Sequence, residues 1–180
     1  MSILVPIVST GITLTEIPDR ITCFIELGNC TQNCAGCHSP HLTAQQPFAF
    51  TSIEDMERMA ERAAEGGANA IALMGGTTNG ISDDDLITIL TTLSCILPVC
   101  LYSGSDDAEH DKYIAQKSGV TWLKTGSYHE ERGGLSSPST NQRFYKLTDR
   151  FVLDNKDNLV QRGTIFHDIT HLFQHQKGDP

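Results

Sequence analysis

Hydrophobic and polar positions follow two different periods through the middle of the chain. Between residues 51 and 67, apolar side chains recur three and four positions apart, as in a helix with one buried face. A capping box at residues 51–54 precedes this pattern, and Gly66-Gly67 ends it. Residues 70–74 are all apolar, and the run is too short for a helix, so we predict a buried strand.

The same alternation continues as far as residue 124. Ser82 begins a predicted helix with aspartates in its first turn, which suits the helix dipole. A weaker helical pattern at 106–117 separates strand patterns at 99–102 and 120–124, and a further strand pattern at 21–27 comes before them all. Strands that alternate with helices predict a parallel sheet. Since ligands bind at the carboxyl ends of such strands, we expect the loops that follow the first three strands to face the same edge of the sheet, which supports a site there.

The last third of the chain has a different pattern. Residues 126–143 are rich in Gly, Ser and other polar residues, and we predict an ordered loop. Strand patterns at 150–153 and 159–162 flank a polar turn, which predicts a β-hairpin. For residues 166–176 we predict a short terminal helix.

Composition narrows the class of protein. The chain has 180 residues, 22 of them acidic and 13 basic, and a formal charge of −9, so we expect no nucleic-acid partner. It has no run of about 20 apolar residues and no basic segment before an apolar one at its start, so we expect neither a membrane span nor a secretory signal. Six cysteines without such a signal favour the reducing cytoplasm, where clustered thiols bind metals or take part in catalysis.

Three cysteines, Cys30, Cys34 and Cys37, lie within eight residues, directly after the first predicted strand. With His38 or His41 they offer the four ligands of a closed zinc site. Alone they offer three thiolates to an iron–sulfur cluster and leave one coordination position open. Three free thiols so close together by accident are improbable.

Zinc sites usually bring cysteines in pairs from two separate loops, and the sequence holds no second pair. The other three cysteines, Cys23, Cys95 and Cys100, fall within the apolar pattern and are expected in the core. The histidines His167, His171 and His175 recur four positions apart. We expect them on one helix face, exposed or partly packed, rather than as metal ligands.

The spacing C-x3-C-x2-C after a first strand resembles the radical S-adenosylmethionine (SAM) enzymes. The resemblance implies a 4Fe-4S cluster on Cys30, Cys34 and Cys37, with SAM bound at the open iron and cleaved by one electron. It also implies that Gly36 and His38, beside the third cysteine, contact the adenine of SAM.

The glycine pair Gly75-Gly76 after the second strand extends the resemblance. In the superfamily a Gly-Gly-Glu motif at this place holds the amine of SAM, and glycine permits close approach of the backbone to a ligand. This chain has Thr77 where Glu is usual. A Thr hydroxyl accepts a hydrogen bond from an ammonium group but forms no ion pair, so either a carboxylate comes from elsewhere or SAM binds more weakly.

Three segments, at residues 101–104, 123–128 and 134–143, are similar to the activating proteins of anaerobic (class III) ribonucleotide reductase. The resemblance covers about residues 20 to 145. It implies that the SAM-derived radical abstracts a hydrogen from a glycine of the reductase catalytic subunit. It also implies an external electron donor of the flavodoxin or thioredoxin type.

Four polar residues of these segments are further candidates for the cofactor site or its mouth: Ser103, Asn141, Gln142 and Arg143. From the resemblance we expect an α/β fold, a partial (β/α)6 radical SAM barrel. It should be one domain over residues 1–180, with a mostly parallel sheet, a C-terminal hairpin and a short terminal helix. Two alternatives stay open, a radical SAM enzyme for a small molecule, similar to a deazapurine synthase, and a non-catalytic zinc-binding module.

Overall fold

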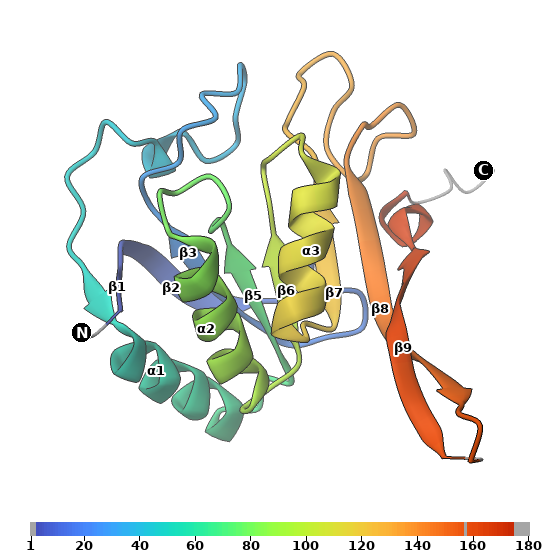
Figure 1. The fold of residues 1–180 in the computed structure, drawn as a ribbon. Coiled ribbons are helices and arrows are strands. Elements are labelled where there is room, and N and C mark those ends of the chain that lie inside the picture. Colours follow the sequence, from blue (N-terminus) through green and yellow to red (C-terminus); the bar gives the residue numbers. More distant parts are fainter. Residues whose placement is uncertain (1–2, 157, 175–180) are drawn as a thin grey trace.

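One large mixed sheet runs through the molecule, and helices cover one of its faces (Figure 1). The structure, a computed structural model, describes residues 3–156 and 158–174. The sheet has the order β2-β3-β5-β6-β7-β8-β9. Its strands are β2 (Ile7–Thr13), β3 (Thr22–Leu27), β5 (Ala70–Met74), β6 (Val99–Tyr102), β7 (Trp122–Thr125), β8 (Arg143–Leu153) and β9 (Leu159–Asp168).

The centre of the sheet is parallel, as the sequence pattern predicted. Strands β3, β5, β6 and β7 pair in parallel, and each connection between them contains a helix. These helices are α1 (Ile53–Glu65), α2 (Asp83–Ser94) and α3 (Ala108–Ser118), which confirms the three helices predicted between residues 51 and 117. Each begins at a side chain that accepts a hydrogen bond from its first turn, namely Ser52, Ser82 and Asp107. Such caps satisfy backbone donors that the helix itself leaves unpaired.

The prediction of a partial (β/α)6 barrel with a mostly parallel sheet is wrong. The sheet is open, with β2 and β9 at its edges, and the pairs β2-β3, β7-β8 and β8-β9 are antiparallel. A separate pair, β1 (Leu4–Val5) with β4 (Thr51–Ser52), is antiparallel too. A parallel neighbour requires a crossover, usually a helix. The segment between β7 and β8 forms turns instead, so β8 returns beside β7 in the opposite direction.

The two faces of the sheet carry separate hydrophobic clusters. Alternating side chains of β5 show the division: Ile71 and Leu73 pack under the helices, whereas Ala70 and Ala72 pack on the other face. That second face is covered by Ile17, from the loop between β2 and β3, together with aromatic residues. None of the helices α1, α2 and α3 therefore contributes to the cluster on the second face.

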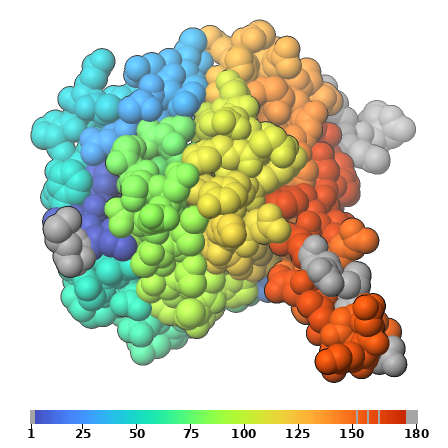
Figure 2. Space-filling model, viewed as in Figure 1, coloured from blue at the N-terminus to red at the C-terminus, as the bar shows by residue number. Residues whose placement is uncertain are grey.

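The C-terminal hairpin is longer than predicted. Strands β8 and β9 run over eleven and ten residues, and their tip projects from the body of the molecule (Figure 2). The predicted terminal helix is largely wrong, because residues 166–168 belong to β9 and, in the described part of the predicted range 166–176, only Thr170–Phe173 form a short 3-10 helix, η2. Another 3-10 helix, η1, spans Pro40–Leu42.

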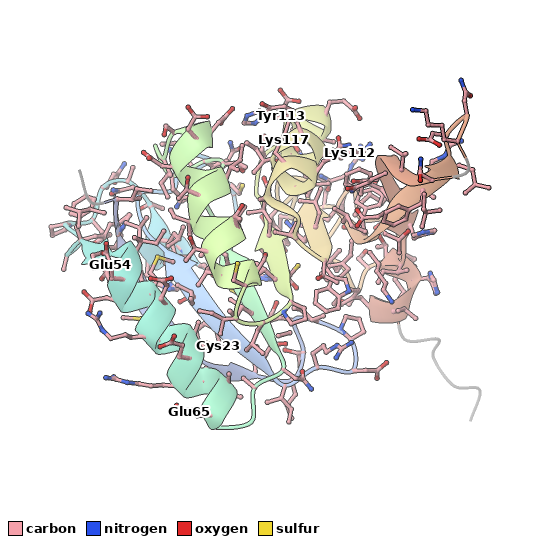
Figure 3. The ribbon with its side chains drawn as sticks, turned by 60° about the horizontal axis from the view of Figure 1, so that its bottom comes forward. Cys23, Glu54, Glu65, Lys112, Tyr113 and Lys117 are labelled. Carbon is pink, nitrogen blue, oxygen red and sulfur yellow. The ribbon has the colours of Figure 1, made fainter. Side chains whose placement is uncertain are left out.

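Helix α3 packs against both the parallel core and the C-terminal hairpin. Lys112 of α3 places its ammonium 5.6 Å from the centre of the Tyr145 ring on β8, a cation–π distance. Figure 3 shows Tyr113 and Lys117 on the side of the same helix that faces away from the sheet. None of the helices in the described residues is long and apolar enough to cross a membrane.

Candidate functional site

The loops that follow the parallel strands are hydrogen-bonded to each other or to the carboxyl-terminal part of a neighbouring strand. The Thr31 amide, in the loop after β3, donates to the Thr78 carbonyl in the loop after β5 at 3.0 Å. The Gly75 amide donates to the Tyr102 carbonyl, and the Ser103 amide donates to the Lys124 carbonyl, at 2.9 and 2.7 Å. The expectation that these loops share one edge of the sheet is therefore confirmed.

The cysteine loop folds back on itself. The Cys30 amide donates to the Leu42 carbonyl, and the Ala44 amide donates to the Cys30 carbonyl, at 2.8 and 2.9 Å. Within the loop, the Cys37 amide donates to the Cys34 carbonyl at 3.2 Å. This turn includes Gly36, whose φ of +67° is rarely adopted by other residues. The loop thus holds the second and third cysteines on one short turn.

The three loop thiols are free and partly exposed. Cys30 Sγ lies 3.7 Å from the Thr78 hydroxyl, and Cys37 Sγ accepts a hydrogen bond from the Ser39 amide at 3.3 Å. As the side chains lie, the described residues contain no group of three or more His, Cys, Asp or Glu that converges on a metal position. The donor chemistry of the loop, three thiols on a short accessible segment, nevertheless fits a thiophilic metal or an iron–sulfur cluster.

The glycine pair after β5 makes a turn that other residues fit poorly. Gly75 and Gly76 have φ of +107° and +121°. A Cβ atom at Gly76 would lie 2.8 Å from Leu86 Cδ1. The buried Asn79 holds this turn, because its Oδ1 accepts from the Gly76 amide at 2.7 Å while its Nδ2 donates to the carbonyls of Leu27 and Gly28. Sequence reasoning missed Asn79, although a polar residue directly after a glycine turn is a signal for such a role.

Thr77 joins the ends of β5 and β6. Its hydroxyl lies 2.6 Å from that of Ser103. The Thr125 hydroxyl, on β7, donates to the carboxylate of Asp111 on α3, and Asp111 has no exposed surface. Burial raises the pKa of Asp111, and the hydrogen bond from Thr125 partly offsets the rise. The other carboxylate oxygen, Oδ1, is buried and has no hydrogen-bond partner among the described residues. Sequence reasoning did not select Asp111, because an aspartate in a first helical turn is ordinarily solvated.

Lys124, on β7, is a buried cation that sequence reasoning also missed. The residue is 8 % exposed, and its Nζ donates to the carbonyls of Ser103 and Gly126 at 3.1 and 2.8 Å. Burial lowers its pKa to about 8. A lysine within an apolar strand pattern was the available signal, since lysine is almost never fully buried without a partner.

The loop after β7 contacts the cysteine loop. The rings of His38 and Tyr128 have their centres 4.7 Å apart, and a Cβ atom at Gly36 would lie 3.0 Å from Glu130 Cδ. In the same loop, the Ser127 hydroxyl donates to Asp106, and hydrogen bonds from Ser127 lower the pKa of this carboxyl. The His38 ring therefore packs on an aromatic neighbour at the edge of the cysteine loop.

The candidates at residues 141–143 divide into two groups. Asn141 Nδ2 donates to the Ser127 carbonyl at 3.0 Å, and the buried Gln142 Nε2 donates to the Gly126 carbonyl at 3.3 Å. Both therefore support the loop after β7. Arg143 instead donates to carbonyls of its own segment, and its Nε lies 3.6 Å from Asp168 Oδ2 on β9. It therefore contacts the hairpin and not the loop after β7.

His167 and His171 do not share a helix face. His167 lies in β9 with its Nε2 2.9 Å from the Thr148 hydroxyl, and His171 lies in η2. His175 is outside the described residues. His41, a candidate fourth ligand for zinc, has its Nε2 3.4 Å from a Glu26 carboxylate oxygen.

Two pockets are described here, both at the surface of the molecule. One of about 460 Å³ borders the cysteine loop at Asn29 and Thr31, next to Gly80. The other, of about 520 Å³, lies between the end of α3 and the hairpin, at Lys117 and Asp149. Neither is lined by the cysteines. No protein-family model, no curated protein and no solved structure matches the chain.

Proposed function

We propose that the protein is a radical SAM activase, which reductively cleaves SAM and generates a glycyl radical on an anaerobic ribonucleotide reductase. One observation carries the proposal. The three-cysteine loop and the Gly75-Gly76-Thr77 turn lie at the same edge of the sheet and are hydrogen-bonded through Thr31 and Thr78. The proposal needs only the parallel core β3-β5-β6-β7, not a closed barrel.

In this proposal, Cys30, Cys34 and Cys37 hold a 4Fe-4S cluster, and SAM occupies the coordination position that the three thiolates leave open. When bound, the cluster supplies the single electron that cleaves SAM to methionine and a 5′-deoxyadenosyl radical. The chain's own residues bind and orient SAM and exclude water from it.

The glycine turn is the proposed place of the methionyl group of SAM. Without Cβ atoms, Gly75 and Gly76 allow backbone groups to approach a ligand closely. The hydroxyls of Thr77 and Ser103 lie beside this turn, 2.6 Å apart, and offer acceptors for the ligand amine. His38 and Gly36, on the cysteine turn, are the proposed neighbours of the adenine.

The loop after β7 forms the proposed rim toward the partner. It contacts the cysteine loop through Tyr128, and the side-chain amides of Asn141 and Gln142 donate hydrogen bonds to its backbone carbonyls. A glycine-bearing loop of the reductase catalytic subunit would enter here. A reducing compartment, the cytoplasm, and an external flavodoxin- or thioredoxin-type electron donor complete the proposal.

The test is anaerobic reconstitution with iron and sulfide, followed by an assay for 5′-deoxyadenosine with SAM and a reductant. Wild type should form the product, and Cys34→Ala should not. Cys95→Ala is the matched control, because Cys95 is an exposed thiol at the end of α2, outside the cysteine loop. This variant should keep full cleavage.

Three results would contradict the proposal. Full cleavage by Cys34→Ala would overturn the assignment of ligands. One equivalent of zinc in anaerobically purified protein, without iron or sulfide, would indicate a zinc-binding module. SAM cleavage without a glycyl signal in electron paramagnetic resonance, with the purified reductase subunit present, would favour a small-molecule substrate.

A further inference from the structure

The outer part of the C-terminal hairpin carries apolar side chains on one face. Nearer the core, Tyr145 and Leu147 of β8 pack in the cluster under the helices. Side chains alternate along a strand, so Phe151 and Leu153 lie on that same face of β8. Leu159 of β9 is directly opposite Leu153 and shares the face with it. We call Phe151, Leu153 and Leu159 the hairpin tip.

The hairpin tip lies outside the hydrophobic core. Its three residues are 50, 64 and 68 % exposed, and this end of the hairpin projects from the body of the molecule (Figure 2). Along β8, the cluster under the helices reaches Leu147 and includes no residue beyond it. Apolar side chains that gather on one exposed face, rather than lying scattered, mark an interaction surface.

A pocket of about 520 Å³ lies between the hairpin tip and the end of α3. Lys117 of α3 lines it together with Asp149 and Gln161 of the hairpin. Gln161 is directly opposite Phe151, so the pocket adjoins the tip. On the outer side of α3, Tyr113 is 49 % exposed (Figure 3). One molecule therefore presents a projecting apolar surface beside a hollow and an exposed aromatic ring.

The distribution of charge favours a second copy of the chain as the partner of this surface. Residues 143–168 include five basic and four acidic residues, whereas the rest of the chain has eight basic and 18 acidic ones. Two copies of so acidic a chain repel each other over most of their surface, but not where the charges balance. The pocket carries both signs, in Lys117 and Asp149, and no ion pair joins these two residues.

The position of the hairpin tip leaves the candidate site free. Strand β8 begins beside the carboxyl end of β7 and runs antiparallel to it. Its far end therefore lies at the opposite end of the sheet from the cysteine loop (Figure 1). A partner bound to the tip and to α3 does not cover the cysteine loop.

We propose that this surface forms a symmetric dimer, in which the hairpin tip of each copy packs against the outer side of α3 of the other copy. In a twofold contact, each pair of residues occurs twice with the copies exchanged. The tip of one copy covers Tyr113 of the other, and Lys117 of each copy pairs with Asp149 of the other. Stable interfaces bury about 800 Å² per copy, more than three side chains offer, so the contact includes α3 and the pocket.

Sedimentation velocity of the full chain over a concentration series tests the dimer. Wild type should show a monomer–dimer equilibrium. Phe151→Ser and Leu159→Ser should each raise the dissociation constant of the dimer by about tenfold or more, because each removes a buried apolar contact twice. Leu14→Ser is the matched control and should keep the wild-type constant. Leu14 is 69 % exposed but follows β2, at the other edge of the sheet.

Charge reversal identifies the partner as a second copy. Lys117→Glu and Asp149→Lys each place like charges opposite one another, so each variant alone should dimerise about tenfold more weakly or worse. An equimolar mixture of the two should regain the dimer, since each substituted side chain meets the opposite charge on the other variant. Circular dichroism checks that every variant is folded.

Three results would overturn the inference. The first is a wild-type chain that stays monomeric at every concentration. The second is a dimer that both substitutions in the hairpin tip leave unchanged. The third is a mixture of the two charge variants that dimerises no better than either variant alone.

Discussion

The side chain of Asn79 hydrogen-bonds to the Gly76 amide with its oxygen and to the Gly28 carbonyl with its nitrogen. It therefore ties the glycine turn after β5 to the segment that leads into the cysteine loop. Asn79 is 4 % exposed. If its side chain is removed, water therefore cannot replace it as the hydrogen-bond partner of the Gly76 amide and the Gly28 carbonyl.

Asn79→Ala should lower the free energy of unfolding by about 2–4 kcal/mol, because it leaves several buried backbone groups unpaired. Urea unfolding followed by circular dichroism measures the change. Asn155→Ala, in the exposed turn of the hairpin, is the control and should stay within about 0.5 kcal/mol of wild type. Equal stability of Asn79→Ala and wild type would contradict the role of Asn79.

The glycine turn predicts a difference between two Gly→Ala substitutions. Gly76→Ala should cost about 2–4 kcal/mol, because φ is +121° and the new Cβ would meet Leu86 at 2.8 Å. Gly80→Ala is the control, since its φ is +73° with no atom within 4 Å of the new Cβ. It should cost about 1–2 kcal/mol. Thermal unfolding measures both, and similar losses would mean that Gly76 is not tightly enclosed.

The buried carboxyl of Asp111 predicts a pH dependence of stability. Its pKa in the folded state is raised above the ordinary 3.8 by burial. Between these two values the folded state binds more protons than the unfolded state, so this group's contribution to stability falls as pH rises through that window. Asp111→Asn has no such titration. Its stability relative to wild type should therefore improve as pH rises through the window, as measured by urea unfolding at each pH.

Asp106 gives the control of opposite sign. Hydrogen bonds from Ser127 lower the pKa of Asp106 in the folded state below 3.8. The contribution of this carboxyl to stability is therefore present above its unfolded-state pKa and is lost as the pH falls through its folded-state pKa. The stability of Asp106→Asn relative to wild type should therefore worsen as pH rises through that lower window. A gap between Asp111→Asn and wild type that stays constant with pH would contradict the assigned environment of Asp111.

The thiols should divide into two classes in metal-free native protein. Cys30, Cys34, Cys37 and Cys95 are partly or well exposed, so these four should react rapidly with a thiol-specific disulfide reagent. Cys23 and Cys100 are buried and burial raises the pKa of both, so they should react only after unfolding. Counting the released chromophore measures the classes. Binding of a metal or cluster to the cysteine loop should leave Cys95 as the single rapid thiol.

Local patterns predicted the parallel core well. The cap of α2 is Ser82 as expected, the cap of α1 is Ser52, one residue after the Thr51 of the predicted capping box, and the apolar run at 70–74 forms β5. Both signals act within a few residues, so they survive in any tertiary context. The barrel prediction was wrong because it assumed further strand–helix units after β7, whereas only three helical crossovers form. Nothing local in residues 126–142 showed that β8 would return antiparallel to β7.

The sequence by itself determined the helices and strands of the parallel core and which loop carries the three thiols, because helix periodicity, caps and cysteine spacing are local properties of the chain. Only the tertiary structure decided that Asn79 ties two loops, that Asp111 is buried against Thr125, and that Lys124 is buried with no ion pair to any other described residue. These relationships join residues that are distant in sequence, and they depend on strand register and on which face of the sheet each side chain occupies.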